Sequence, residues 1–250
     1  MKRCLVCIAF ALLASGCATY RTPGAGIDVG NLSRTDEDIA QVMERQPAAH
    51  YPARLAVVRA QAPGYYSKGH GCYGRGRYCV STTRDIETER SLERIVRLPM
   101  ISAVAPMSQI LLPPQLESVR DLRRAAAQLR TDILLLYSVD TRFNIESTDI
   151  GPLALISLGF IPNKKAQVTS TASAALIDVR SGFVYGVAEA SATQQQRATM
   201  WSSEGAVDSA RLKTEADALE KLLGEFEKLW KAVVEEHART SPQPQLATSD

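Results

Sequence analysis

The sequence predicts an α/β (α+β) fold, a single domain in which amphipathic helices pack on a mixed β-sheet. Apolar runs typical of strands alternate with segments of helical periodicity, in the order β-α-β-α-β-β-β-α. The composition agrees, because 45% hydrophobic and 22% charged residues in a chain of 250 are ordinary for one globular domain. We place this domain at residues 51–238.

The first half of the domain alternates strands and helices. Residues 55–58 predict a buried strand, and 86–98 predict an amphipathic helix that Pro99 ends. Residues 100–105 predict a short apolar strand. A second helix is predicted over 116–129, because leucines and alanines recur along one stripe of it. Its arginines occupy the opposite side and are expected to face solvent: Arg120, Arg123 and Arg124.

The second half begins with the most apolar strand of the chain, DILLLYSV at 132–139. Both of its faces are apolar, which places it in the centre of the sheet. Residues 167–179 and 183–194 predict an antiparallel hairpin around a turn at 178–182. Residues 204–237 predict a long closing helix, because apolar residues recur in it at steps of three and four.

The amino terminus has the composition of a secretory signal peptide, which we place at residues 1–16. Two basic residues precede an apolar run of eleven, which is too short for a permanent membrane helix. Ser15 and Gly16 then precede Cys17, a pattern that resembles the lipobox of bacterial lipoproteins. The resemblance implies cleavage between Gly16 and Cys17, diacylation of the Cys17 thiol, and N-acylation by a fatty acid such as palmitate. The alternative is an ordinary cleaved signal followed by a chance cysteine.

The residue after the acylated cysteine suggests a location. In the lipoprotein pattern, a residue other than Asp there goes with sorting to the outer membrane, and this chain has Ala18. We therefore expect a lipid-anchored protein of the outer membrane that faces the periplasm. Residues 17–50 are expected to form a tether and a short helix, and 239–250 a disordered tail.

The charge balance narrows the range of partners. Removing the signal reduces the 29 basic residues to 27, equal to the 27 acidic ones. A neutral chain argues against nucleic acid as a partner and against electrostatic attachment to anionic lipid. We therefore expect the membrane to be contacted through the lipid on Cys17, because two or more acyl chains hold a protein stably.

Two cysteines remain after the signal and Cys17 are accounted for. In an exported protein, Cys72 and Cys79 predict a disulfide, here closing a loop at 63–81 that is rich in glycine and tyrosine. The alternative is a metal site with His70 as a third ligand, but a fourth ligand is not evident. Tyrosine and arginine are enriched at binding hot spots, so six residues are candidates for partner contact: Tyr65, Tyr66, Tyr73, Arg75, Arg77 and Tyr78.

The sequence does not contain a recognisable catalytic motif. It lacks a Gly-x-Ser-x-Gly elbow, a phosphate loop, a dinucleotide fingerprint and a His-Glu-x-x-His helix. The three histidines fall in a linker, a loop and a helix end: His50, His70 and His237. We therefore expect no enzyme activity, no catalytic residues, no metal and no cofactor.

Residues from about 55 to 229 resemble known envelope proteins. A helix running into the central strand, LRRAAAQLRTDILLLYSVDTRF (122–143), precedes a hairpin whose turn reads Asp-Val-x-x-Gly, ALIDVRSGFVYGVAEASA (175–192). With the closing helix, these features resemble the lipoprotein family of the curli secretion channel and the amino-terminal domain of TolB-like proteins. The overall layout resembles the rhombotail lipoproteins, although this chain lacks their glycine-rich tail. The resemblance implies a role in envelope assembly, export or protein contacts.

These observations together predict a non-enzymatic, lipid-anchored assembly or secretion accessory module that binds other envelope proteins or associates with itself. Two alternatives remain open. The first is an oligomeric export-channel subunit that inserts the apolar stretch 151–162 in the membrane, although buried core or a loop packed on a partner also fits that stretch. The second is an unrecognised periplasmic hydrolase, which a deep pocket lined by paired carboxylates would indicate.

Overall fold

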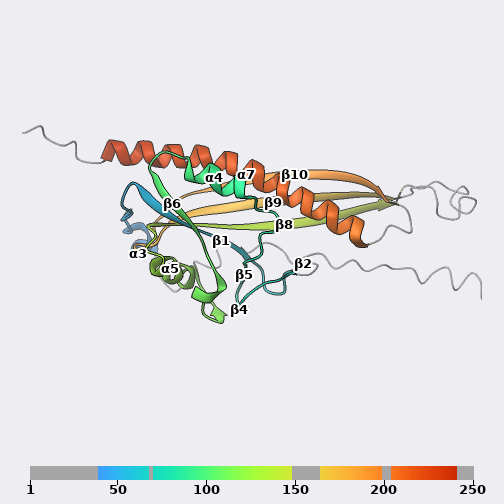
Figure 1. Cartoon of the computed structure of the whole chain (residues 1–250), viewed down its shortest axis with the longest axis horizontal. Coiled ribbons are helices and arrows are strands. Elements are labelled where there is room, and N and C mark those ends of the chain that lie inside the picture. The colour runs from blue at the N-terminus through green and yellow to red at the C-terminus, as the bar shows by residue number, and fades with distance from the viewer. Residues whose placement is uncertain (1–38, 68–69, 148–163, 199–203, 241–250) are drawn as a thin grey trace, which may run out of the picture.

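The protein forms a mixed β-sheet with helices on both faces (Figure 1). The computed structural model describes residues 39–67, 70–147, 164–198 and 204–240. The sheet runs in the order β10-β9-β8-β1-β5, and β6 also pairs with β1. Its strands are β1 (Ala53–Gln61), β5 (Cys79–Ser81), β6 (Ile101–Pro106), β8 (Ile133–Ser147), β9 (Lys164–Asp178) and β10 (Val184–Ala198).

The helices complete the predicted order. They are α3 (Ile39–Met43), α4 (Glu89–Val96), α5 (Val119–Gln128) and α7 (Glu204–Thr240), with a short 3₁₀ helix η1 (Gln109–Leu111). The main elements follow as β1-α4-β6-α5-β8-β9-β10-α7, so the predicted fold class is confirmed. The order agrees with the prediction except that the short strand β5 comes between β1 and α4. At the start of α4, Thr88 and Ser91 exchange hydrogen bonds in a capping box. At the start of α5, the carboxylate of Asp121 accepts from the amide of Ser118 at 3.0 Å.

The centre of the sheet is a parallel pair. β1 and β8 run side by side, with Leu55 opposite Ile133 and Val58 opposite Leu136. Parallel strands are buried on both faces, which explains why the apolar run of β8 shows no alternation with polar residues. β9 then pairs antiparallel with β8, and β10 pairs antiparallel with β9 and ends the sheet on that side.

Two apolar cores result, one on each face of the sheet. α7 and α4 cover one face, where Leu135 packs with Phe226 and Trp230. α5 covers part of the other face, where Leu122 packs with Leu134. Figure 1 shows α7 and α4 above the sheet and α5 below it. The sheet thus separates a face occupied by the long helix from a face that α5 covers at one end.

Three strands are longer than the sequence predicted. β8, β9 and β10 have 15 residues each, whereas we expected them to span 132–139, 167–179 and 183–194. Their added residues are mainly polar and are held by antiparallel pairing. The β8–β9 ladder reaches as far as the pair Ser147 and Lys164, and the β9–β10 ladder as far as the pair Lys164 and Ala198. Hydrogen bonding to neighbours thus extends strands whose side chains do not signal burial.

The loop at 63–81 contains four short strands, the last of which is β5, and a disulfide. β2 (Tyr66–Ser67) pairs with β3 (His70–Gly71), while β4 (Arg75–Gly76) pairs with β7 (Gln115–Leu116). Cys72 and Cys79 are joined by a disulfide with a Cα–Cα distance of 5.5 Å. The pairing of β4 with β7 holds the tip of the loop against the segment that leads into α5.

Several predicted features lie outside the described residues. They are the signal peptide with Gly16 and Cys17, most of the tether, the apolar stretch 151–162 and residues 241–250 of the predicted tail, whose first two residues, 239–240, belong instead to α7. Within the described ranges, no helix combines the length and the apolar character needed to cross a membrane.

Candidate functional site

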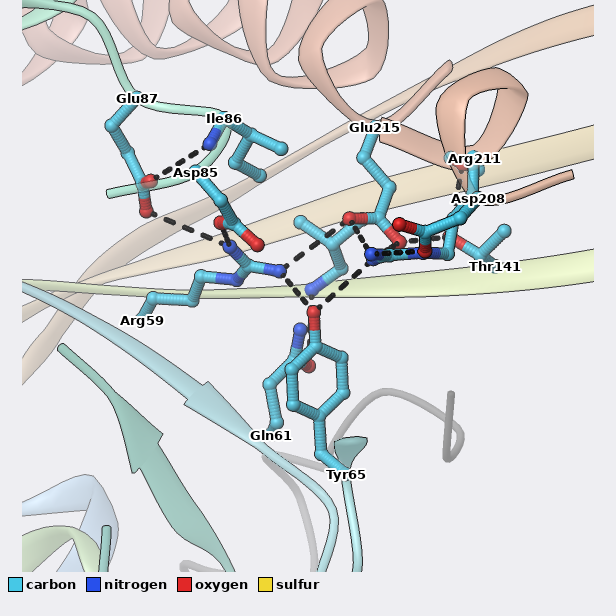
Figure 2. Close-up of polar contacts among 12 residues, drawn as sticks. Arg59, Gln61, Tyr65, Asp85, Ile86, Glu87, Thr141, Asp208, Arg211 and Glu215 are labelled. Carbon is cyan, nitrogen blue, oxygen red and sulfur yellow. Dashed lines mark hydrogen bonds and ion pairs between the residues drawn. The ribbon is translucent and has the colours of Figure 1, made fainter. Parts of the chain in front are cut away.

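A cluster of buried polar side chains lies between the sheet and the amino-terminal part of α7 (Figure 2). We call it the buried polar cluster. Strands β1, β8 and β9 and helix α7 contribute to it. So do the segment just before β2 and the segment just after β5. Its members are Arg59, Gln61, Tyr65, Asp85, Glu87, Tyr137, Thr141, Ser170, Asp208, Arg211 and Glu215.

The local structure explains why these charges are buried. Side chains alternate along a strand, so Arg59 continues the row on β1 that begins with Leu55 and faces α7. On α7, Arg211 and Glu215 are four residues apart and lie on the stripe that Leu219 continues. The inward stripe of α7 is therefore apolar over most of its length and charged near its amino-terminal end.

Glu215 is the centre of the cluster, and its side chain is 1% exposed. Both of its carboxylate oxygens accept from Nη1 of Arg211 at 3.0 Å. Nη2 of Arg59 lies 3.5 Å from Oε2, and Oγ1 of Thr141 donates to Oε1 at 2.9 Å. Glu215 thus connects α7 to β1 and β8 through charge-assisted contacts.

Arg59 makes a second set of contacts on its other side. Its Nη1 donates to Oδ1 of Asp85 at 2.6 Å and lies 3.9 Å from Oε1 of Glu87. Its Nη2 donates to the hydroxyl of Tyr65 at 2.8 Å. Burial disfavours the charge of Arg59, but its tyrosine and carboxylate neighbours outweigh this and raise its pKa above the ordinary value.

Two tyrosines connect the charged groups. The hydroxyl of Tyr65 lies between the two guanidinium groups (Figure 2) and accepts from Nη1 of Arg211 at 3.4 Å. The hydroxyl of Tyr137 donates to Oε1 of Glu87. Burial raises the pKa of both hydroxyls, and for Tyr137 the nearby Glu87 raises it further.

This arrangement is suited to holding elements together. The pKa shifts of the cluster's arginines and tyrosines all move away from neutrality, so these groups keep their protons at physiological pH. Arg211 is also bonded to Asp208 at 2.9 Å and Glu215 at 3.0 Å. The acidic and basic groups thus engage one another beneath α7.

The cavities near the cluster are small. One of about 40 Å³ is lined by Arg59, Glu87 and Tyr137 and has room for roughly one water molecule. A larger hollow of about 290 Å³ lies elsewhere, between α4 and β6. Glu93 lines that hollow, but it is exposed and pairs with Arg97 at 3.1 Å. Glu89, four residues earlier on α4, also lines the hollow and is exposed.

The structure separates the six predicted contact residues. Tyr65 is 6% exposed and belongs to the buried polar cluster. Tyr78 is fully buried, and its hydroxyl donates to the carbonyl of Ser118 at 2.9 Å. These two tyrosines are not accessible to a partner, so the prediction of partner contact is wrong for them. Their rings pack inside the protein.

The remaining predicted contacts lie nearer the surface. Tyr73 is half-buried and donates to the carbonyl of Leu112 at 3.2 Å, whereas Arg75 and Arg77 are exposed. The side chain of Tyr66 lies outside the described part of the structure. Among the described residues, no group of three or more metal-ligating side chains is present.

Sequence reasoning did not find the buried polar cluster. One signal was available, because Arg211 and Glu215 have i,i+4 spacing in a helix and lie on its apolar stripe. Their partner Arg59 follows an apolar strand, where a basic residue also reads as the end of that strand. Pairing the two required the packing of α7 on β1, which local sequence does not contain.

Comparisons with known proteins give weak similarities. No known family and no curated protein matches the sequence. Protein XCC0632 of Xanthomonas campestris, from family DUF330, is 14% identical over 78% of this chain and 94% of that one, with a TM-score of 0.33. Lipoprotein GNA1162 of Neisseria meningitidis is 16% identical, and the match covers 76% of this chain and 100% of that one, with a TM-score of 0.29. The PelC dodecamer of Paraburkholderia phytofirmans is 15% identical, and the match covers 70% of this chain and 94% of that one, with a TM-score of 0.24. TM-scores of this size do not assign the chain to a family, so the resemblance to rhombotail and curli-channel lipoproteins stays a prediction.

Proposed function

We propose that the protein is a lipid-anchored protein of the outer membrane that acts by binding another protein strand along the free edge of β10. Support for the anchor comes from the signal sequence and Cys17. Support for binding comes from β10, which has 15 residues and pairs only with β9 among the described strands. An unpaired strand edge presents a row of amide and carbonyl groups that can pair with another chain.

The composition of β10 suits strand addition. Natural edge strands usually carry charges, prolines or bulges that prevent pairing with another chain. β10 contains two charged residues, Glu189 and Arg197, and no proline, and its one register shift against β9 lies at its start, between Val184 and Gly186. Val187 is 73% exposed and Val184 is 50% exposed, so apolar side chains are available beside the edge.

α7 protects one point of this edge. Nζ of Lys221 donates to the carbonyl of Ser191 at 3.0 Å, which shows that this carbonyl points away from β9. Residues two positions away along a strand direct their backbone groups the same way. The amides of Glu189 and Thr193 therefore point to the free edge, and proline there removes an edge donor without breaking the β9–β10 ladder.

The polar cluster favours binding over catalysis. Arg59, Arg211 and Glu215 are each about 1% exposed at the side chain and are bonded to one another or to neighbouring tyrosine and threonine hydroxyls. A general acid or base must come within hydrogen-bond distance of a substrate. These groups are instead committed to holding α7 on the sheet.

The experiment is photo-cross-linking in intact cells. A photoreactive residue at Val187 should form a discrete adduct with another protein, whose identity by mass spectrometry separates a second copy from a different partner. The matched control is Ile110, which is 86% exposed and lies in η1. Thr193→Pro should abolish the Val187 adduct while the variant keeps its thermal transition. Equal labelling at both positions, or an adduct that survives Thr193→Pro, would contradict the proposal.

A further inference from the structure

Three large apolar side chains of α3 are exposed on one face of the helix. Ile39 is 76% exposed, Met43 is 78% exposed and Val42 is 45% exposed. Their spacing of three and four residues places them together on one side of a helical turn. α3 therefore presents an apolar ridge to its surroundings.

Arginines lie beside this ridge, on α5 and the turn between β9 and β10. Ala48, which follows α3, donates to Asp178 at 2.7 Å, and Arg123 of α5 donates to the carbonyl of Val179 at 3.0 Å, so both segments meet the same turn. Burial lowers the pKa of Arg123, and the charges of Arg45 and Arg120 lower it further. Arg123 also donates to the carbonyl of Arg180 at 2.6 Å, and Arg124 is exposed on α5. We call this region the α3–α5 surface. It comprises Ile39, Val42, Met43, Arg45, Arg120, Arg123, Arg124 and Arg180.

Glu44 is an exposed carboxylate between Met43 and Arg45, and the two other carboxylates named next have partners of their own. Asp178 is fully buried and accepts from the amides of Ala48, Arg180 and Ser181. Asp121 accepts from the amide of Ser118 at the start of α5. Within the described ranges, Arg120, Arg124 and Arg180 are not in ion pairs. The surface thus combines exposed apolar side chains with an excess of positive charge.

We propose that the α3–α5 surface lies against the anionic phospholipid membrane to which the chain is anchored. The proposal rests on the anchor at Cys17 given under the proposed function. Exposed apolar residues flanked by arginines suit the interface between lipid headgroups and acyl chains. α3 is also the first described element after the anchor, because Ile39 follows Cys17 by 22 residues. A chain of that length spans at most about 75 Å, so the surface stays within reach of the bilayer.

The neutral overall charge is compatible with this arrangement, because the α3–α5 surface is a local excess of cations. On α7, which covers the face of the sheet opposite α5 (Figure 1), Glu220, Glu225 and Glu235 are each paired with a cation: Arg94, Lys228 and Lys231. With the α3–α5 surface on lipid, α7 is directed away from the membrane. The lipid surface thus fixes which side of the domain is presented to soluble partners.

The test uses the full acylated protein in vesicles and a fluorescent probe at a single introduced cysteine. Val42→Cys reports on the α3–α5 surface, and Val96→Cys on α4 is the matched control, because both valines are 45% exposed and α4 lies on the other face of the sheet. In vesicles of phosphatidylglycerol and phosphatidylethanolamine, we expect lipid-borne quenchers to reduce the emission at position 42 at least threefold more than at position 96. In phosphatidylcholine vesicles the difference should shrink.

Charge reversal on the surface should remove the effect. Arg120→Glu with Arg124→Glu should return the emission at position 42 to that at position 96, whereas the matched reversal Arg90→Glu with Arg97→Glu on α4 should not. Equal quenching at both positions in anionic vesicles, with acylation of Cys17 verified by mass spectrometry, overturns the surface proposal and leaves the anchor intact. A chain that lacks acyl groups overturns the anchor instead. Protection of position 42 in cells but not in vesicles would show that a protein covers the surface and would also overturn the proposal.

Discussion

Replacing Glu215 by glutamine removes the charge that two buried arginines share, and we expect a large loss of stability. The glutamine has nearly the same shape, so the change tests the charge and not the packing. Its amide group would face Nη1 of Arg211, which lies 3.0 Å from both carboxylate oxygens in the native protein, or Nη2 of Arg59 at 3.5 Å. At least one donor would then point at another donor.

The magnitude follows from burial. Removing one partner of a buried ion pair costs about 3–5 kcal/mol, because the remaining charge is left without compensation. The same helix provides a control with the same i,i+4 spacing, the exposed pair Lys231–Glu235 at 3.9 Å. Glu235→Gln should change the free energy of unfolding by about 0.5 kcal/mol or less, because solvent screens exposed pairs.

Urea unfolding of the mature chain carrying Cys17→Ser, followed by circular dichroism, measures both variants. A loss of less than about 1 kcal/mol for Glu215→Gln would refute the view that the cluster holds α7 by charge. An equal loss for Glu235→Gln would refute the role of burial. An unchanged m-value for both variants would show that the folded states remain comparable.

Three further predictions follow from single features. Reducing the Cys72–Cys79 disulfide should lower the free energy of unfolding by roughly 2–3 kcal/mol, measured by urea titration with and without reductant, since the closed loop is short. Burial raises the pKa of Asp178, but hydrogen bonds from three backbone amides and one tyrosine outweigh burial, so the pKa in the folded protein is lowered. The ionised carboxylate therefore stabilises the fold above about pH 4, and this contribution is lost as pH falls through the pKa of the folded state. Asp178→Asn should therefore lose stability at pH 7 and show a flatter decline of stability below pH 4. Trp230→Ala should cost about 3–5 kcal/mol in the same unfolding assay. Trp230→Phe loses the 2.7 Å bond to the carbonyl of Pro99 and leaves a smaller cavity, so it should cost about 1–3 kcal/mol.

The sequence was sufficient for the elements whose apolar pattern is strong. The central strand was predicted from its two apolar faces, and the long helix from its repeat of apolar residues. The hairpin turn was predicted at 178–182, where Gly182 has a positive φ of 76°. In these segments local pattern and tertiary packing require the same side chains.

Prediction failed where burial depends on distant contacts. Tyr78 and Tyr65 lie in a glycine-rich loop that reads as surface. Tyr78 is buried beside the paired strands β4 and β7, whereas Tyr65 is buried because its hydroxyl lies between Arg59 and Arg211. The polar ends of β8, β9 and β10 are strands because their neighbours are strands, and their side chains give little sign of it. Arg59 is buried because α7 supplies a carboxylate from 156 positions further along the chain.

The buried polar cluster also bears on how α7 is aligned with the sheet. An apolar stripe can shift along a sheet at modest cost, because apolar contacts are not directional. Ion pairs and hydrogen bonds are directional, so a shift of α7 by one turn would separate Glu215 from Arg59 and Thr141. Replacing the charges by Arg59→Met, Arg211→Met and Glu215→Leu should leave the free energy of unfolding nearly unchanged, since buried ion pairs are often matched by apolar groups of similar volume. Hydrogen exchange in residues 208–215 should nevertheless become faster or heterogeneous, because nothing directional then sets the position of the helix. Unchanged exchange in the triple variant would show that the apolar stripe alone fixes α7.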